Sequence, residues 1–290
     1  MATESEKPKA EEAKNDRKQR KKGLKTSTIV GFSVLACICV PYIYYAMSIN
    51  MYGQNNKPKG YYMPGLWELW MTLVGAAVCT VARYLVFNCL YATFYRISKE
   101  QNDEQLRNKY AYKACDKLYR SIYFICSSFW GWYVLKDTAW LPWYLGGCAG
   151  GDYRNINMST VFEVYPYSLV SYSFYTFGYH LQDFIAHAFF HERMNDFEEM
   201  LLHHIAAVCL YFCYTMGNMF PVGCVIAYLH DLADIPGSLC KFLNSTHYQN
   251  TSVVVFFSCM IVWFFTRILS LPQMIQYIFS LKYADELSHF

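Results

Sequence analysis

The chain has 290 residues, of which 54% are hydrophobic, 19% are aromatic and only 16% are charged. Soluble domains carry charges on about a quarter of their residues, so this composition argues against a soluble protein. The net charge is +3 and no basic stripe alternates with exposed aromatics, so we expect no nucleic acid partner. The twelve cysteines lie in apolar runs without a CxxC pair, so their spacing indicates neither a zinc site nor a disulfide framework.

Residues 1–25 are rich in Lys, Glu and Arg and form a charged tail. Long apolar segments follow, and each is close to the roughly 20 residues that a transmembrane helix needs. The seven segments are Thr26–Met47, Leu66–Phe94, Leu118–Leu135, Tyr167–Phe190, Met200–Gly217, Val222–Leu243 and Ser252–Leu281. The sequence therefore predicts an all-α, polytopic integral membrane protein with about seven transmembrane helices.

The basic residues are concentrated on one side of the predicted spans. Lys and Arg are frequent in the tail and in the connector 96–117, whereas the loops 50–65 and 136–166 hold few of them. Because cytoplasmic loops are enriched in basic residues, we expect the tail in the cytoplasm or on the equivalent face of another organelle. Seven crossings then place the short C-terminal tail, 282–290, on the opposite side.

Five ionisable side chains interrupt two neighbouring apolar segments within residues 195–244. His203 and His204 lie near the start of the first segment, and His230, Asp231 and Asp234 lie in the middle of the second. Residues three and four apart are neighbours on a helix, so the three groups of the second segment share one side. Ionisable groups at membrane depth are costly to bury, so the cluster predicts a functional site.

A short turn around Gly217–Pro221 joins the two segments into an antiparallel hairpin that can bring the five groups together. A histidine paired with a carboxylate suits a general base or a nucleophile. The same residues leave two alternatives open, a metal site and polar hydrogen bonding between helices. His180 and Asp183, three apart on the preceding segment, either line the same cavity or make structural hydrogen bonds.

The stretch resembles the Lag motif of the ceramide synthases, within the TLC (TRAM–Lag–CLN) domain family. That motif reads DF-x-E-x-x-x-HH, then an Asn, a Gly and HD-x-x-D. The matching residues are Asp196, Phe197, Glu199, His203, His204, Asn218, Gly223, His230, Asp231 and Asp234. Residues 113–134, with Tyr119 and Arg120, are similar to the first helix of the family domain, and 265–272 are similar to its TR…LP segment.

This resemblance implies a helical barrel that joins a fatty acyl-CoA to a sphingoid base among membrane lipids. The acyl-CoA is then a substrate, and no cofactor or metal is expected. The resemblance makes His203 the acyl acceptor, with an acyl-imidazole as intermediate. It gives His204, Asp231 and Asp234 the tasks of orienting His203 and handling the proton of the amine. The expected supporting residues are His230, Asn218, His180 and Asp183.

The resemblance also sets the expected domain organisation. An extra N-terminal transmembrane helix lies at 26–49, a helix that precedes the domain at 66–95, and the TLC domain at 113–281, with the Lag motif at 195–244. We expect the family's last transmembrane helix to be missing. The extra helix, a second copy of the chain or a larger membrane complex would then replace it.

Some positions depart from the family pattern. Ala233 stands where the family usually has Ser, Pro221 stands where it has Arg, and Ser238–Lys241 replaces its LE-x-AK ending. These departures favour an alternative, in which the chain is a catalytically degenerate, structural or lipid-binding subunit of a larger complex, for example in the mitochondrial inner membrane. We prefer the acyltransferase, for which the resemblance implies the endoplasmic reticulum.

Overall fold

The structure is a computed structural model that describes residues 26–57, 59, 62–156, 164–190 and 197–278. Both predicted tails, 1–25 and 282–290, lie outside these residues. The described residues form helices and connecting loops, and no strand occurs among them. The predicted all-α class is thus confirmed for the part of the chain that the structure describes.

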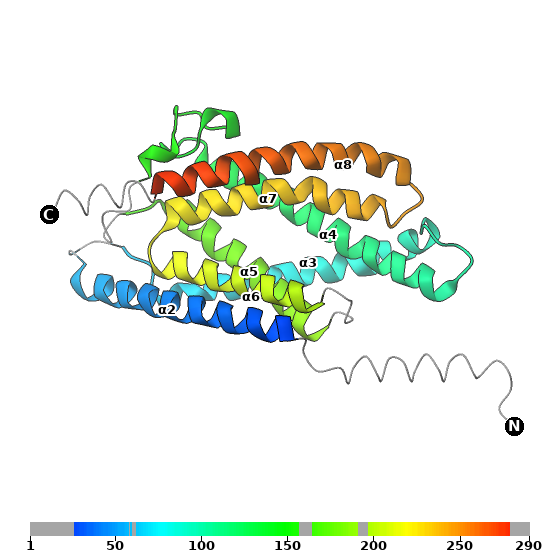
Figure 1. Ribbon diagram of the computed structural model, residues 1–290, viewed down its shortest axis with the longest axis horizontal. Coiled ribbons are helices and arrows are strands. Elements are labelled where there is room, and N and C mark those ends of the chain that lie inside the picture. Colours follow the sequence, from blue (N-terminus) through cyan, green and yellow to red (C-terminus); the bar gives the residue numbers. More distant parts are fainter. Residues whose placement is uncertain (1–25, 58, 60–61, 157–163, 191–196, 279–290) are drawn as a thin grey trace, which may run out of the picture.

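Seven α-helices occur in the described ranges, each close to a predicted apolar segment (Figure 1). They are α2 (Thr26–Asn56), α3 (Leu69–Arg96), α4 (Glu104–Leu135), α5 (Tyr167–Phe189), α6 (Phe197–Met216), α7 (Phe220–Leu243) and α8 (Gln249–Trp263). Three short 3₁₀ turns, Leu66–Glu68, Trp143–Leu145 and Tyr153–Asn155, lie in the connections. After α8 the chain continues as a π-helix, Phe264–Ser270, and then as a helix to residue 278.

Among the described residues, four helical stretches are long and apolar enough to cross a membrane by length and composition. They are Thr28–Asn56, Leu66–Arg96, Phe197–Met216 and Asn250–Ile278. The predicted membrane protein is supported, whereas a count of seven spans is not established. Helices α4, α5 and α7 carry many of the polar side chains described below, and these lower the hydropathy of each helix.

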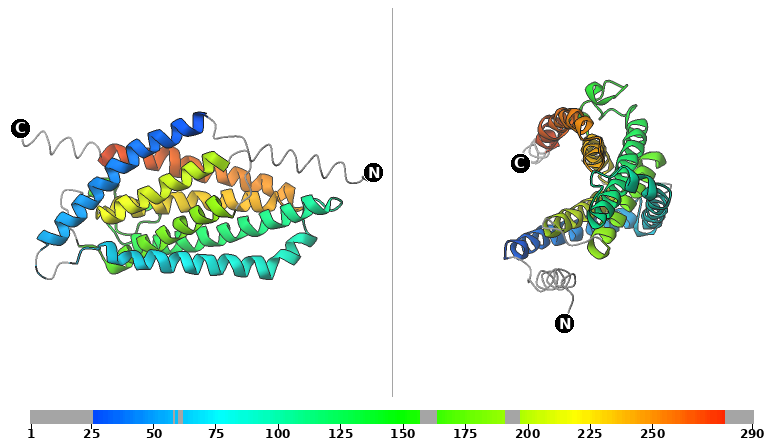
Figure 2. Two further views of the ribbon diagram at one scale, coloured as in Figure 1. Left: turned by 90° about the horizontal axis from the view of Figure 1, so that it is seen from below. Right: turned by 90° about the vertical axis from the view of Figure 1, so that its right-hand side faces the viewer.

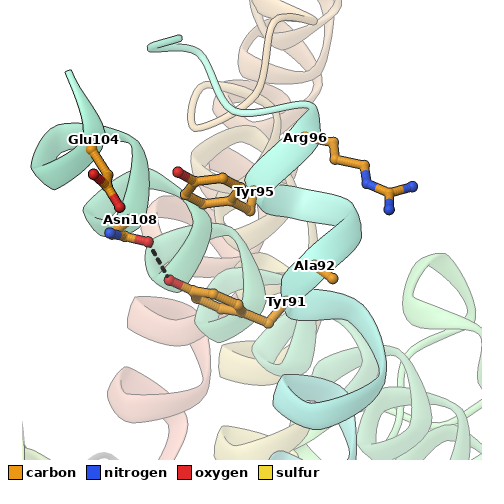
Figure 3. A pocket seen from close by; sticks show the side chains of 6 residues that line it. All are labelled: Tyr91, Ala92, Tyr95, Arg96, Glu104 and Asn108. Atoms are coloured by element: carbon orange, nitrogen blue, oxygen red, sulfur yellow. Dashed lines mark hydrogen bonds between the residues drawn. The ribbon is translucent and has the colours of Figure 1, made fainter. Parts of the chain in front are cut away.

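Helix α4 begins fourteen residues before the apolar segment that predicted it, at Glu104 rather than Leu118. Asp103 caps this start, because its carboxylate accepts hydrogen bonds from the backbone N–H groups of Gln105 and Leu106 at 2.9 and 3.1 Å. The apolar pattern could not show this polar first part of the helix. It extends α4 beside the end of α3, where Tyr91 donates a hydrogen bond to Asn108 (Figure 3).

The helices lie side by side and form an open arc when viewed along their length (Figure 2, right). Helix α8 packs on α7, α7 packs on α4, and α4 packs on α3. On the other side α3 packs on α5, α5 on α6, and α6 on α2. Helices α8 and α2 therefore occupy the two ends of the arc. The resemblance implies a helical barrel, and the described helices form an arc that is open on one side.

Helices α3 and α5 approach each other closely at two glycines. A Cβ atom on Gly178 would lie 2.5 Å from the carbonyl oxygen of Thr72, and one on Gly75 would lie 2.8 Å from that of Tyr175. Small residues allow this approach, which is a common way to pack helices in membranes. The contact fixes α5, which carries Asp183, against α3.

Buried charges also join the first helices of the arc. Arg83 of α3 binds Asp116 of α4 at 2.6 Å, and Arg120 of α4 binds the same carboxylate at 3.1 Å. Arg120 reaches further to Asp183 of α5, with both terminal nitrogens at 2.7 Å from its two oxygens. Removal of one partner from a buried ion pair leaves the other charge uncompensated and costs about 3–5 kcal/mol.

Two prolines lie inside helices, and a third follows a distorted helical segment. Helices α2 and α7 continue through Pro41 and Pro236. Before Pro272 the chain adopts the π-helix Phe264–Ser270. Pro272 has no N–H to donate to the carbonyl four residues earlier, so a widened turn before it is a physically reasonable solution. This turn carries Arg267.

We expect Gly178→Ala to destabilise the protein by about 1–3 kcal/mol, because the added methyl group overpacks the backbone of α3. Thermal unfolding in one detergent measures the change. The matched control is Gly237→Ala in α7, where the nearest atom to the new Cβ is Cys259 Sγ at 3.7 Å. This control should be neutral or slightly stabilising, since Ala is the better helix former. Equal unfolding temperatures for the two variants would contradict the close helix contact.

Asp116→Ala should lower the free energy of unfolding by about 3–5 kcal/mol, since it removes the buried carboxylate that Arg83, Lys117 and Arg120 share. Asp137→Ala is the control, because Asp137 is 71% exposed and pairs only with its neighbour Lys136 among the described residues. An exposed pair contributes about 0–1 kcal/mol. Denaturant or thermal unfolding measures the loss in free energy of unfolding for each of the two variants. A loss at Asp116 no larger than at Asp137 would show that the ion network does not support the fold.

Candidate functional site

The structure places the two histidines and the two aspartates at matching depths on α6 and α7. A turn at Gly217–Met219 joins the helices, as the sequence predicted. His203 and His204 lie about 20 Å before this turn along α6, and Asp231 and Asp234 lie about the same distance after it along α7. The two helices nevertheless pack mainly on other neighbours, α6 on α5 and α2, and α7 on α4 and α8. The site therefore has two halves.

The first half centres on His204, which is buried. Its Nδ1 lies 3.7 Å from Oδ2 of Asp183, which is also buried. This distance is longer than a hydrogen bond, so the contact is electrostatic. A carboxylate beside Nδ1 favours the tautomer with a proton on that nitrogen. The Nε2 atom is buried and has no hydrogen-bond partner among the described residues.

His203 differs from His204 in its surroundings. Its side chain is exposed, and its ring centre lies 5.6 Å from that of His204. His203 is also close enough to interact electrostatically with His230 and Asp234 of α7. His203 is thus the more exposed of the two histidines, and a substrate can reach it more readily than it can reach His204.

The second half is formed by α7 with partners on α4 and on the π-helix. Asp231 is 1% exposed, and its Oδ2 accepts a hydrogen bond from Ser127 at 2.5 Å. Asp234 is half-buried and lies 3.5 Å from Arg267. The Nδ1 of His230 lies 2.8 Å from the carbonyl oxygen of Ile226, so it donates to that carbonyl and directs Nε2 away from the helix backbone.

His180 belongs to the first half, although it makes no ion pair with Asp183 among the described residues. Its ring lies 4.4 Å from that of Tyr211, and it interacts electrostatically with His203, His204 and His230. Asp183, the other supporting residue predicted on α5, contacts Arg120 and His204 directly. The structure therefore brings both α5 residues to the histidine pair.

Asn218 does not join this group. It lies in the turn between α6 and α7, at the opposite end of α6 from the histidine pair, with φ at +55°. Asn is one of the few residues that adopt this left-handed conformation readily. Its place in the motif is therefore explained by the turn, not by contact with the ionisable cluster.

The presence of Gly223 in the motif also has a structural explanation. The ring of Tyr214 lies against it, so a Cβ atom at this position would come within 2.2 Å of that ring. Of the other motif residues, Asp196 lies outside the described residues, and Phe197 places its carbonyl oxygen 3.1 Å from the Nε2 of His187. The motif thus combines residues for chemistry with residues for local packing.

Three residues that contact the site have no assigned role in the sequence prediction. These are Arg120, Ser127 and Arg267. Arg120 and Arg267 lie in segments that resemble the family, but a resemblance gives no contact. Arg120 lies four residues after Asp116, a helical spacing that could have indicated an ion pair. No spacing in the sequence could have indicated the role of Ser127, because this residue contacts Asp231 only through the packing of α4 on α7.

The alternative of a metal site finds no support in the described residues, where no three His, Cys, Asp or Glu side chains are placed to hold an ion. A shallow pocket of about 340 Å³ lies elsewhere, between the ends of α3 and α4 (Figure 3). Its lining residues are Tyr91, Ala92, Tyr95, Arg96, Glu104 and Asn108. None of them belongs to the histidine and aspartate cluster.

Residues 113–289 match the TLC domain family, TRAM_LAG1_CLN8. The chain is 28% identical to ceramide synthase 4 of Mus musculus over 190 residues, which cover 63% of this chain and 43% of that protein. It is 24% identical to ceramide synthase hyl-2 of Caenorhabditis elegans over 233 residues, 77% of this chain and 67% of the relative. Sphingosine N-acyltransferase lag1 of Schizosaccharomyces pombe is 23% identical over 212 residues, 72% of this chain and 50% of that protein.

These alignments leave much of some relatives unmatched, since the chain spans less than half of the mouse protein and half of the yeast protein. The family match over residues 113–289 nevertheless contains the whole of α5, α6 and α7, and with them the histidines and aspartates of the site. The family match also covers more than half of the 290 residues. The protein is therefore a member of the TLC domain family, with similarity to ceramide synthases.

Proposed function

We propose that this protein is an N-acyltransferase that joins a fatty acyl-CoA to a sphingoid base. The single observation that carries the proposal is the buried His204, whose Nδ1 lies beside Asp183 and whose Nε2 has no hydrogen-bond partner among the described residues, next to the accessible His203. Acyl transfer to an amine needs a nucleophile or a base in this arrangement. Similarity to proteins named ceramide synthase and sphingosine N-acyltransferase indicates the substrates.

The first step of the proposed reaction forms an acyl-enzyme. A ring nitrogen of His203 attacks the thioester carbonyl of the acyl-CoA, and the carbon–sulfur bond breaks. The thiolate of CoA leaves and takes up the proton that the other ring nitrogen of His203 releases. His203 then carries the acyl group as an acyl-imidazole. His203 suits this task because its side chain is exposed.

The second step transfers the acyl group to the sphingoid base. The amine attacks the acyl carbonyl, the bond to the His203 nitrogen breaks, and an amide forms. The neutral amine loses one proton to a neighbouring base, and this base passes the proton to the departing nitrogen of His203, so both histidines end the reaction neutral. We assign this role to Nε2 of His204, since Asp183 beside Nδ1 would stabilise the imidazolium that results. The acyl-imidazole survives only where water is kept away, and the apolar helices provide such surroundings.

Asp231 and Asp234 have different surroundings and therefore different proposed roles. Asp234 is half-buried and interacts electrostatically with His203, so it is placed to attract the protonated amine toward the acyl group. Asp231 is buried against Ser127 and holds α7 on α4. We further propose that the protein resides in the endoplasmic reticulum, as the resemblance implies.

We expect the purified protein to make ceramide from a long-chain acyl-CoA and sphinganine. His203→Ala should lower this activity by a factor of about 10³ or more, because the covalent intermediate cannot form. Product analysis by mass spectrometry measures turnover. Intact-protein mass spectrometry after incubation with acyl-CoA alone should show one acyl adduct on the wild type and none on His203→Ala.

His247→Ala is the matched control, since this histidine is exposed and lies in the connection between α7 and α8. It should retain wild-type activity. Acyl-CoA species from 14 to 26 carbons, about the range of natural fatty acyl chains, should be tested together. Absence of both ceramide and acyl adduct with every acyl-CoA, in protein that unfolds cooperatively, would overturn the proposal and favour a structural or lipid-binding role.

A further inference from the structure

A chain of alternating buried charges leads from α3 to the histidine pair. It begins at Arg83 of α3, continues through Asp116 and Arg120 of α4, and reaches Asp183 of α5. Oδ2 of Asp183 contacts Arg120 at 2.7 Å and faces Nδ1 of His204 at 3.7 Å. The charges alternate in sign along this path, so each one stabilises its neighbours.

Arg120 is the centre of this chain because it uses three nitrogens on two carboxylates. Nη1 and Nη2 each donate a hydrogen bond of 2.7 Å to Asp183, and Nε donates one of 3.1 Å to Asp116. A planar guanidinium that binds a carboxylate with two parallel bonds fixes the plane of that carboxylate as well as its position. Lys has the same charge but no such fork, so it cannot replace this geometry.

The orientation of the Asp183 carboxylate determines the electrostatic surroundings of the His204 ring. Both oxygens of Asp183 are held by Arg120, so the carboxylate cannot rotate away from the imidazole without losing two charged hydrogen bonds. A fixed negative charge beside Nδ1 keeps the proton on that nitrogen and leaves Nε2 available as an acceptor. The side chain of His204 is otherwise enclosed, with His187 and His203 as ring neighbours at 5.1 and 5.6 Å.

We propose that Arg120 is a positioning residue that sets the tautomer of His204 through Asp183, and that Arg83 supports it through Asp116. The expected effect of Arg120 on turnover rests on the proposed function. Its expected effect on the tautomer of His204 does not. Arg83 precedes residues 113–289, which match the TLC domain. Helix α3 therefore supplies a part of the site that the domain match alone does not contain.

The test compares Arg120→Lys with the wild type and with Arg107→Lys. Arg107 is a matched control on the same helix, because it also makes specific contacts, a hydrogen bond of 2.8 Å to the Tyr95 carbonyl oxygen and a stacked contact with the Tyr95 ring. Each protein is labelled with ¹⁵N-histidine, and the nitrogen shifts report the tautomer of each of the eight histidines. A His204→Gln variant assigns the signal.

We expect wild-type His204 to carry its proton on Nδ1, and Arg120→Lys to show a mixture of both tautomers. In the activity assay Arg120→Lys should lower kcat about 10–100-fold, because a displacement of about 1 Å at a catalytic group has effects of this size. KM for the acyl-CoA should change by less than about threefold, since binding contacts remain. Arg83→Lys should shift the tautomer and kcat in the same direction, but less.

Arg107→Lys should leave the tautomer and kcat at their wild-type values even where its unfolding temperature falls. The inference is overturned if Arg120→Lys keeps the wild-type tautomer, or if Arg107→Lys alters it to the same extent. If the wild type makes no ceramide, the proposed function fails, and the nitrogen shifts still decide whether Arg120 sets the tautomer.

Discussion

The carboxylate of Asp183 both joins α5 to α4 and places a negative charge in the candidate site. It is buried, and its charge is balanced by two short hydrogen bonds from Arg120. A buried carboxylate without such a partner would be strongly unfavourable, so α4 and α5 are bound together by the same contact that places the charge beside His204. The close approach of α5 to α3 at Gly178 then sets the depth of Asp183 in the arc.

This arrangement explains why the two halves of the site differ. In the half on α6, His204 is enclosed and faces the carboxylate of Asp183, while His203 beside it is exposed. The half on α7 is anchored at Asp231 by Ser127, while Asp234 remains partly accessible. Each half thus contains one buried group and one accessible group. The accessible groups are the ones that two substrates could contact during an acyl transfer.

Much of this could be predicted from the sequence. Apolar segments of spanning length predicted the seven helices because a helix in lipid must satisfy its backbone internally and cover itself with apolar side chains. Helical spacing predicted that His230, Asp231 and Asp234 share a side of α7, and the turn residues predicted the antiparallel pair α6 and α7. The start of α4 was placed too late, because Asp103 and the polar turns after it do not belong to the apolar pattern. The roles of the individual site residues stay predictions.

The sequence by itself determined the class of the protein, the order of its helices and the identity of the ionisable cluster. The tertiary structure decided which residues these groups contact. Helical periodicity gives the face on which a side chain lies but not the helix that covers this face. Arg120 contacts Asp183, which lies 63 residues later in the chain, and Ser127 contacts Asp231, which lies 104 residues later. Likewise, the sequence placed Asn218 in the turn between the two segments, but only the structure showed the positive φ that explains why Asn stands there.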